Sequence, residues 1–137
     1  MKRLHLSLIL LVLFMPLRAQ EFDGMTEKGI RAIMAKDFPG LTPDNLVRND
    51  IHRYLKYHSA DNNETWLIFL DDKDRCKGTR ITYSIGLYDT KVSELNKKYR
   101  SEKDGKWSYT MGRELITVEV KRDVWFFTVT HERTHKK

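Results

Sequence analysis

The chain contains 137 residues, of which 40% are apolar and 32% are charged, and its formal charge is +6 at neutral pH. This length favours one ordinary domain. The single cysteine, Cys76, excludes an intramolecular disulfide, so the sequence predicts a fold that is held together by packing.

The first residues have the order of a secretory signal peptide. A basic start over residues 1–5 precedes a nearly continuous apolar run over residues 6–17, and the small residue Ala19 follows. We therefore expect cleavage before Gln20 and assign residues 1–19 to the leader. The apolar run is too short to cross a bilayer, which needs about 20 helical residues.

The alternatives are an uncleaved anchor and a buried N-terminal helix, and both are disfavoured by Pro16 and by the switch to polar residues at Gln20. The junction between Ala19 and Gln20 resembles those of many exported bacterial proteins. This resemblance implies a bacterial protein that is periplasmic or extracellular.

Cleavage changes the charge of the working protein. Removing 19 of the 137 residues leaves 118 in a single exported domain, residues 20–137. The leader carries three cations and no acid, so the formal charge falls from +6 to +3. This modest charge and the expected export argue against nucleic acid as a partner.

Residues 26–38 are predicted to form the first helix. Ile30, Met34 and Phe38 recur at helical spacing, and Thr26 is a suitable N-cap. A strand is then expected over residues 51–58. Its alternation places Leu55 and Tyr57 on one face, and Tyr54 and His58 on the other face, which we expect to be solvated.

A hairpin is predicted next. Residues 66–70 form an unbroken apolar run, residues 71–74 are a polar turn, and β-formers resume over residues 79–83. A strand that is apolar on both faces is typical of a sheet centre, where we place residues 66–70. The acidic turn fails the EF-hand calcium pattern at Cys76 and Lys77. We expect Cys76 to be a small buried apolar residue.

The second predicted helix covers residues 89–99, with Asp89 or Thr90 as its cap. Five cations lie on its exposed side or near its C-terminal end: Lys91, Lys97, Lys98, Arg100 and Lys103. A solvated face is the simpler interpretation, because cations are favourable near a helix C-terminus. Docking of an envelope accessory protein through this basic helix is an alternative.

Three further strands are predicted over residues 107–111, 115–120 and 124–130. In the last of them we expect Trp125, Phe127 and Val129 to enter the core and Phe126 to face the other way. We expect residues 132–137 to fray.

These elements predict an α+β fold, a two-layer sandwich in the order α-β-β-β-α-β-β-β. Both helices are expected on one face of a mainly antiparallel sheet of about six strands. The two halves are alike in plan, and the letters around Trp66 and Trp125 also look alike. The other face of the sheet is expected to be partly exposed and to carry Tyr54, His58 and Phe126.

One string resembles the signature of zinc metallopeptidases. His131, Glu132 and His135 match His-Glu-x-x-His, which on a helix presents two imidazoles to zinc and a carboxylate to a bound water. Such a helix would have to begin directly after a strand, with no apolar residue to pack it down. A zinc-dependent hydrolase that uses His131 and His135 as metal ligands is therefore an alternative, and we expect no cofactor.

The sequence thus favours a small exported module that binds without catalysis. We expect the aromatic sheet face with Tyr54, His58 and Phe126 to bind a protein, a peptide or a glycan. We expect no membrane span after cleavage, and a monomer or weak oligomer. Neither the partner nor a catalytic site that only the fold assembles can be identified from these residues.

Overall fold

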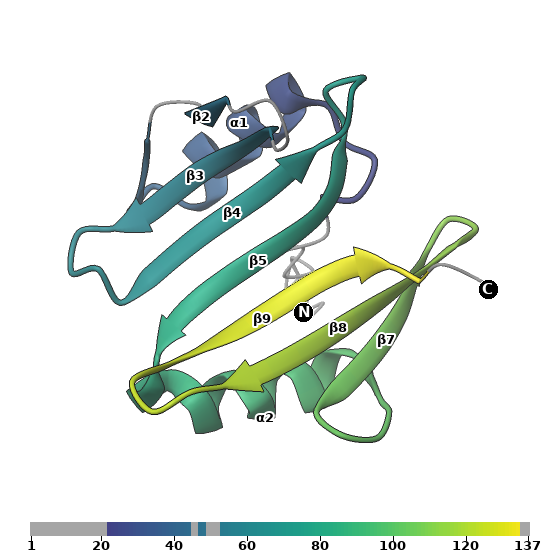
Figure 1. The fold of residues 1–137 in the computed structure, drawn as a ribbon. Helices are drawn as coiled ribbons and strands as arrows, with labels where there is room; N and C mark the ends of the chain where they lie inside the picture. The colour runs from purple at the N-terminus through teal and green to yellow at the C-terminus, as the bar shows by residue number, and fades with distance from the viewer. Residues whose placement is uncertain (1–21, 45–46, 49–52, 135–137) are drawn as a thin grey trace, which may run out of the picture.

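The computed structural model describes residues 22–44, 47–48 and 53–134. The predicted leader, residues 1–19, lies outside these described residues, as do the first two residues of the strand expected over residues 51–58 and His135 of the zinc-type motif. The described residues form an α+β fold in which one antiparallel sheet packs against two helices (Figure 1).

The helices are α1, Glu27–Asp37, and α2, Tyr88–Lys98, and a short 3-10 turn, η1, spans Ile85–Leu87. The strands are β1 Leu41–Pro43, β2 Val47–Arg48, β3 Arg53–Ser59, β4 Glu64–Leu70, β5 Cys76–Ser84, β6 Arg100–Ser101, β7 Lys106–Met111, β8 Glu114–Arg122 and β9 Phe126–Arg133.

The sheet has more strands than the expected six. Eight strands follow the order β1-β3-β4-β5-β9-β8-β7-β6, and β2 adds a ninth beside β3. The six predicted strands correspond to the six long ones, whereas β1, β2 and β6 have two or three residues each. Such short segments carry no readable period, which is why the sequence pattern missed them.

The centre of the sheet also differs from the prediction. We expected residues 66–70 there, but the middle pair is β5 and β9, and β4 lies one strand away. On β4, residues Trp66, Ile68 and Leu70 are buried, while the alternating residues Leu67 and Phe69 are half-buried. One face of β4 is apolar because it is in the core, and the other face is apolar although it is partly exposed. The apolar run is therefore no sign of a central position.

The two halves repeat one plan. Each half has a helix followed by three long strands, α1 with β3-β4-β5 and α2 with β7-β8-β9, and the halves meet where β5 pairs with β9 (Figure 1). The likeness of the letters around Trp66 and Trp125 compares unlike positions, because Trp66 lies in β4 and Trp125 lies in the turn before β9. The two halves share one plan, but the similar sequences around Trp66 and Trp125 do not occupy equivalent positions in it.

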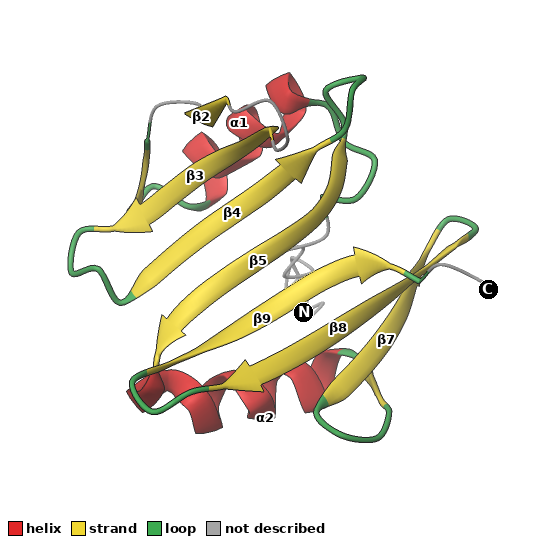
Figure 2. Ribbon diagram, in the orientation of Figure 1, coloured by secondary structure: helices red, strands yellow, loops and turns green. Residues whose placement is uncertain are grey.

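Both helices cover the same face of the sheet (Figure 2). The ring of Phe38, which ends α1, lies 5.0 Å from the ring of Trp66, and Tyr88 of α2 lies 5.2 Å from Phe127. Trp66 and Phe127 share a face, because Trp66 pairs with Ile81 and Ile81 pairs with Val129, two residues from Phe127. We call this side the covered face, and it supplies the core.

The two helices differ in how their N-termini are capped. The side chain of Thr26 caps α1 as predicted, accepting a hydrogen bond from the amide of Gly29 at 3.3 Å. The caps expected for the second helix were wrong: α2 begins at Tyr88, and the residue before it, Leu87, makes no side-chain capping bond. The 3-10 turn leads directly into α2 and satisfies the amide of Tyr88 through the carbonyl of Ile85.

The last strand is shifted toward the C-terminus. It begins at Phe126 instead of residue 124, because the amide of Asp123 donates to the carbonyl of Phe126 and closes a tight turn. Trp125 therefore lies in the turn, where its side chain is 80% exposed, and the prediction that it enters the core was wrong. Residues 132–133, expected to fray, pair with β5 and β8.

Candidate functional site

The side of the sheet away from the helices is the open face, and no element of the described residues packs on it. Strand alternation defines its members. On β3, β4, β5 and β9 these are Tyr54, Lys56, His58, Thr65, Leu67, Phe69, Gly78, Arg80, Thr82, Ser84, Phe126, Thr128, Thr130 and Glu132. The open face is the first candidate site because it is apolar in part and yet uncovered.

The three residues predicted for binding all lie on the open face but not together. Tyr54 pairs with Phe69, and His58 follows four residues later on β3, about 13 Å along the strand. Phe126 lies on β9, opposite Ser84. The fold therefore spreads Tyr54, His58 and Phe126 over one surface instead of gathering them into one site.

An aromatic and cationic cluster forms around Tyr54 instead. The ring of Phe69 meets that of Tyr54 edge-on, with 6.0 Å between centroids. The guanidinium of Arg80 lies 5.8 Å from the centroid of Phe69. Because Arg80 is exposed, one side of this pair faces solvent and is available to a ligand.

A groove of about 380 Å³ lies beside this cluster, and its lining includes Phe69, Arg80, Thr130 and Glu132. Gly78 lies on its floor, between its partners Phe69 and Glu132. A Cβ atom at position 78 would lie 3.0 Å from the backbone oxygen of His131, so the backbone of β9 would have to move to make room for it. Glycine therefore allows β9 to approach β5 and leaves the groove unfilled.

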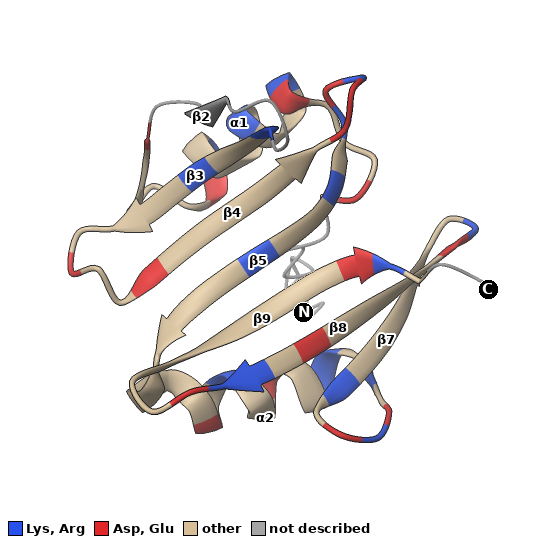
Figure 3. Ribbon diagram, in the orientation of Figure 1, with Lys and Arg blue, Asp and Glu red and all other residues tan. Residues whose placement is uncertain are grey.

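Charged positions occur along β3, β5 and β9 (Figure 3), and they differ in their ion-pair partners. Lys56 and His58 both lie near the carboxylate of Asp44, at 3.2 and 3.3 Å. Arg80 and Glu132, in contrast, have no ion-pair partner among the residues that the structure describes. Lys77 also lines the groove and is exposed, so the groove presents Lys77, Arg80 and Glu132 to a ligand.

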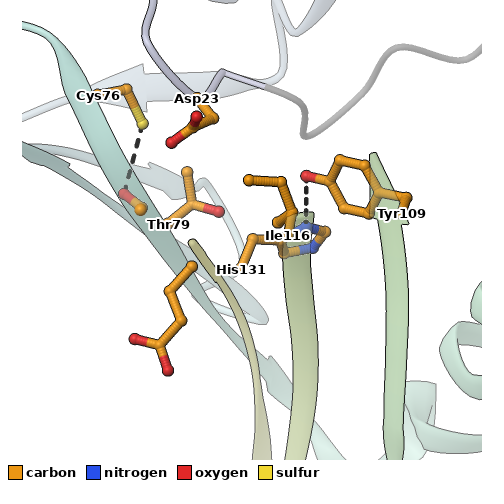
Figure 4. Close-up of a pocket in the computed structure, with 8 residues that line it drawn as sticks. Asp23, Cys76, Thr79, Tyr109, Ile116 and His131 are labelled. Carbon is orange, nitrogen blue, oxygen red and sulfur yellow. Dashed lines mark hydrogen bonds between the residues drawn. The ribbon is translucent and has the colours of Figure 1, made fainter. Parts of the chain in front are cut away.

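A second candidate is a buried cluster on the covered face (Figure 4). The hydroxyl of Tyr109 lies 3.3 Å from Nδ1 of His131, and both residues line a cavity of about 10 Å³ with Cys76 and Thr79. Oγ1 of Thr79 has no hydrogen-bond partner within the described residues. A polar cavity of this size holds about one water molecule and is too small for a substrate.

The electrostatics of this cluster also disfavour catalysis. Burial raises the pKa of the Cys76 thiol to about 12, so the thiolate is scarce at neutral pH. Burial, together with the charge of Lys98, lowers the pKa of His131 to about 3, so the imidazole stays neutral. The expectation that Cys76 is a buried apolar residue is confirmed, and neither group is suited to a proton-transfer role.

The zinc-type motif does not form a helix. His131 and Glu132 lie in β9, where His131 is 3% exposed on the covered face and Glu132 points to the open face. The helical signature needs two imidazoles on one face of a helix, with the carboxylate close enough to act on the zinc-bound water. No group of three metal-ligating residues occurs within the described ranges. This geometry gives the zinc hydrolase no support, and His135 is outside the described residues.

The acidic turn before β5 behaves as a hairpin turn. One carboxylate oxygen of Asp71 accepts hydrogen bonds from the amides of Arg75 and Lys73, at 3.0 and 2.9 Å. These bonds, that from Arg75 first, lower the pKa of Asp71. The carboxylate is therefore occupied by its own backbone, as the sequence interpretation expected of a turn rather than a calcium loop.

Sequence reasoning missed Phe69, Gly78 and Arg80. The signal for Phe69 was present, since a residue three places from Trp66 in a strand lies on the opposite face. The positions of Gly78 and Arg80 beside it depend on the bulge between Phe69 and Leu70, which shifts the register of β5. That shift has no signature in the sequence.

Comparisons with family models, with curated proteins and with solved structures find no match to this chain. Within the described residues, neither helix has the length and apolar character needed to span a membrane.

Proposed function

We propose that this chain is a small exported, non-catalytic binding module whose ligand lies on the open face of the sheet. The ligand is a protein, a peptide or a glycan, and the protein works in the periplasm or outside the cell. The observation that carries the proposal is the aromatic groove: a face that the described residues leave uncovered holds Phe69 and Tyr54 beside a depression of about 380 Å³.

Three properties of the groove support binding. Its aromatic wall supplies apolar contact area at low cost in side-chain entropy. Arg80 and Glu132 supply an orienting cation and anion at its rim. Gly78 keeps its floor open and is built into the pairing of β5 with β9, so the floor is part of the rigid sheet.

The alternatives have less support in the fold. For the zinc hydrolase, His131 is buried and turned away from Glu132. For the envelope accessory that docks through its basic helix, two of the cations already have partners within the molecule. Lys91 pairs with Glu94 at 3.1 Å, and the amine of Lys98 lies 5.1 Å from the centroid of Tyr99.

The test is a ligand selection against the full chain with a random peptide display library and a glycan array. Phe69→Ser and Arg80→Ser each remove one wall of the groove. Leu115→Ser is the matched control, because Leu115 is also a partly exposed apolar residue but lies on β8 and does not line the groove. We expect selected ligands to bind the control as they bind the natural chain, and to bind Phe69→Ser at least about tenfold more weakly.

Two results would contradict the proposal. One is a set of ligands that bind Phe69→Ser and Arg80→Ser as tightly as the natural chain. The other is the absence of any selected ligand from both collections.

A further inference from the structure

The turn between β8 and β9 exposes apolar residues that the core does not use. Val124 is 71% exposed, Trp125 80% and Phe126 42%. The other two tryptophans of the chain, Trp66 and Trp107, are 2% and 4% exposed. We call residues 123–126 the hairpin tip. Three consecutive exposed apolar residues at the end of a hairpin are a feature that solubility alone would select against.

Several backbone groups of the hairpin tip already make hydrogen bonds. The amide of Asp123 donates to the carbonyl of Phe126 at 2.8 Å, and the amide of Ile85 donates to the carbonyl of Trp125 at 3.0 Å. The amide of Val124 donates to the carboxylate of Asp123 at 2.6 Å. These groups keep their hydrogen bonds when the tip leaves water. The tip therefore avoids part of the main cost of entering an apolar medium, which is the burial of polar groups without partners.

The charges behind the tip complement phosphate groups. Lys121 and Arg122 directly precede it and are exposed, and the guanidinium of Arg122 lies 4.5 Å from the ring centroid of Tyr88. The amine of Lys121 lies 4.0 Å from the carboxylate of Glu119, a long contact that leaves the lysine side chain 74% exposed. The one carboxylate of the tip, that of Asp123, is turned to its own backbone. The apolar side chains thus lie at the end of the hairpin, and the cations lie on the strand just behind it. This order matches that of acyl chains and phosphates at a bilayer surface.

We propose that the hairpin tip binds a lipid surface, with Trp125 and Val124 in the interfacial layer and Lys121 and Arg122 at the lipid phosphates. This surface is separate from the groove. Phe126 pairs with Ser84, whereas Gly78 of the groove floor lies six residues away along β5, about 20 Å. A protein held by the tip keeps its groove open to a second ligand.

The experiment measures the position of Trp125 itself. The full chain is mixed with vesicles of phosphatidylcholine, with and without phosphatidylglycerol, and tryptophan emission and its quenching by brominated phosphatidylcholine are recorded. The apolar segment of residues 6–17 can attach the chain to a vesicle by itself, so attachment is not the readout. We expect a blue shift and quenching that Trp125→Ala abolishes, because Trp66 and Trp107 are buried.

Val124→Asp keeps the fluorophore and should lower its partition into the interface about tenfold or more. Leu115→Asp is the matched control, since Leu115 is 40% exposed near the other end of β8 and should leave the quenching unchanged. Salt should reduce the quenching of Trp125 on the anionic vesicles, because it screens the attraction between the lipid phosphates and Lys121 and Arg122.

The proposal is overturned if Trp125 stays unquenched on both kinds of vesicle, which is the outcome for a tip that fits a protein pocket. It is equally overturned if Val124→Asp leaves the quenching unchanged. Circular dichroism of each variant confirms that the fold is retained.

Discussion

The two faces of the sheet are built from the same strands and end in different environments. On β4, Ile68 is fully buried beneath the helices, and its neighbour Leu67 is half-buried on the open face. Apolar character alone therefore does not decide which residue forms the core. The position of the helices decides it, and the apolar residues on the other face remain partly exposed.

The largest effect on stability is expected when Ile68 and Leu67 are each replaced by alanine. Ile68→Ala should lower the free energy of unfolding by about 2–5 kcal/mol, because it removes a buried side chain and leaves a cavity. Leu67→Ala should lower it by about 1 kcal/mol, since that side chain is already partly in water. Urea unfolding measures both, and equal effects would show that the open face is packed like the core.

The next effect concerns pH and His131 of the covered face. Burial lowers the pKa of His131 from 6.5 to about 3, whereas the unfolded chain keeps the ordinary value. The unfolded state therefore binds the proton first, and the stability that is present above the ordinary pKa is lost as the pH falls toward the folded one. Between about pH 7 and pH 5 we expect a loss of about 2 kcal/mol.

Unfolding by urea at each pH measures this loss, and His131→Gln should remove most of it. His58→Gln is the matched control on the open face, where the side chain is half-exposed. An unchanged pH dependence in His131→Gln would show that the imidazole is not buried in its neutral form.

A smaller effect is expected at Thr79, on the covered face of β5. Its hydroxyl is buried and lacks a hydrogen-bond partner among the described residues. Thr79→Val should therefore raise the free energy of unfolding by about 1 kcal/mol, because it removes an unsatisfied polar group. A fall in stability would indicate that a water in the adjoining cavity bonds to this hydroxyl.

The smallest effect is expected on the open face, at Arg80. Its guanidinium rests near the ring of Phe69, and a cation–π contact in an exposed position contributes about 0.5–1 kcal/mol. A double-mutant cycle with Arg80→Ala and Phe69→Ala measures the coupling by thermal unfolding. A coupling of several kcal/mol would mean that this pair belongs to the structural framework rather than to a free surface.

Much of the fold followed from hydrophobic periodicity, and the exceptions have physical causes. Both helices and most of the long strands carry a clear period, and β4 is marked by its unbroken apolar run of β-formers. The pairing of β5 with β9 joins residues far apart in the chain, and no local pattern encodes it. Trp125 was misplaced because alternation extends back into the turn, whereas a hydrogen bond between Asp123 and Phe126 closes that turn and delays the start of β9.

The candidate site was predictable as a face but not as a groove. Alternation correctly placed Tyr54, His58 and Phe126 away from the core. The aromatic groove depends on which strand lies beside β4 and on a missing side chain at Gly78. Both features come from sheet order and register, and a single sequence does not contain them in readable form.

The sheet has one face that the helices cover and one face that they leave open. Hydroxyl-radical footprinting of the native chain, read by mass spectrometry, tests this directly by comparing neighbours on β4. We expect Leu67 and Phe69 to be oxidised much faster than Trp66 and Ile68. Equal protection of all four residues would show that something covers the open face, and would contradict the account.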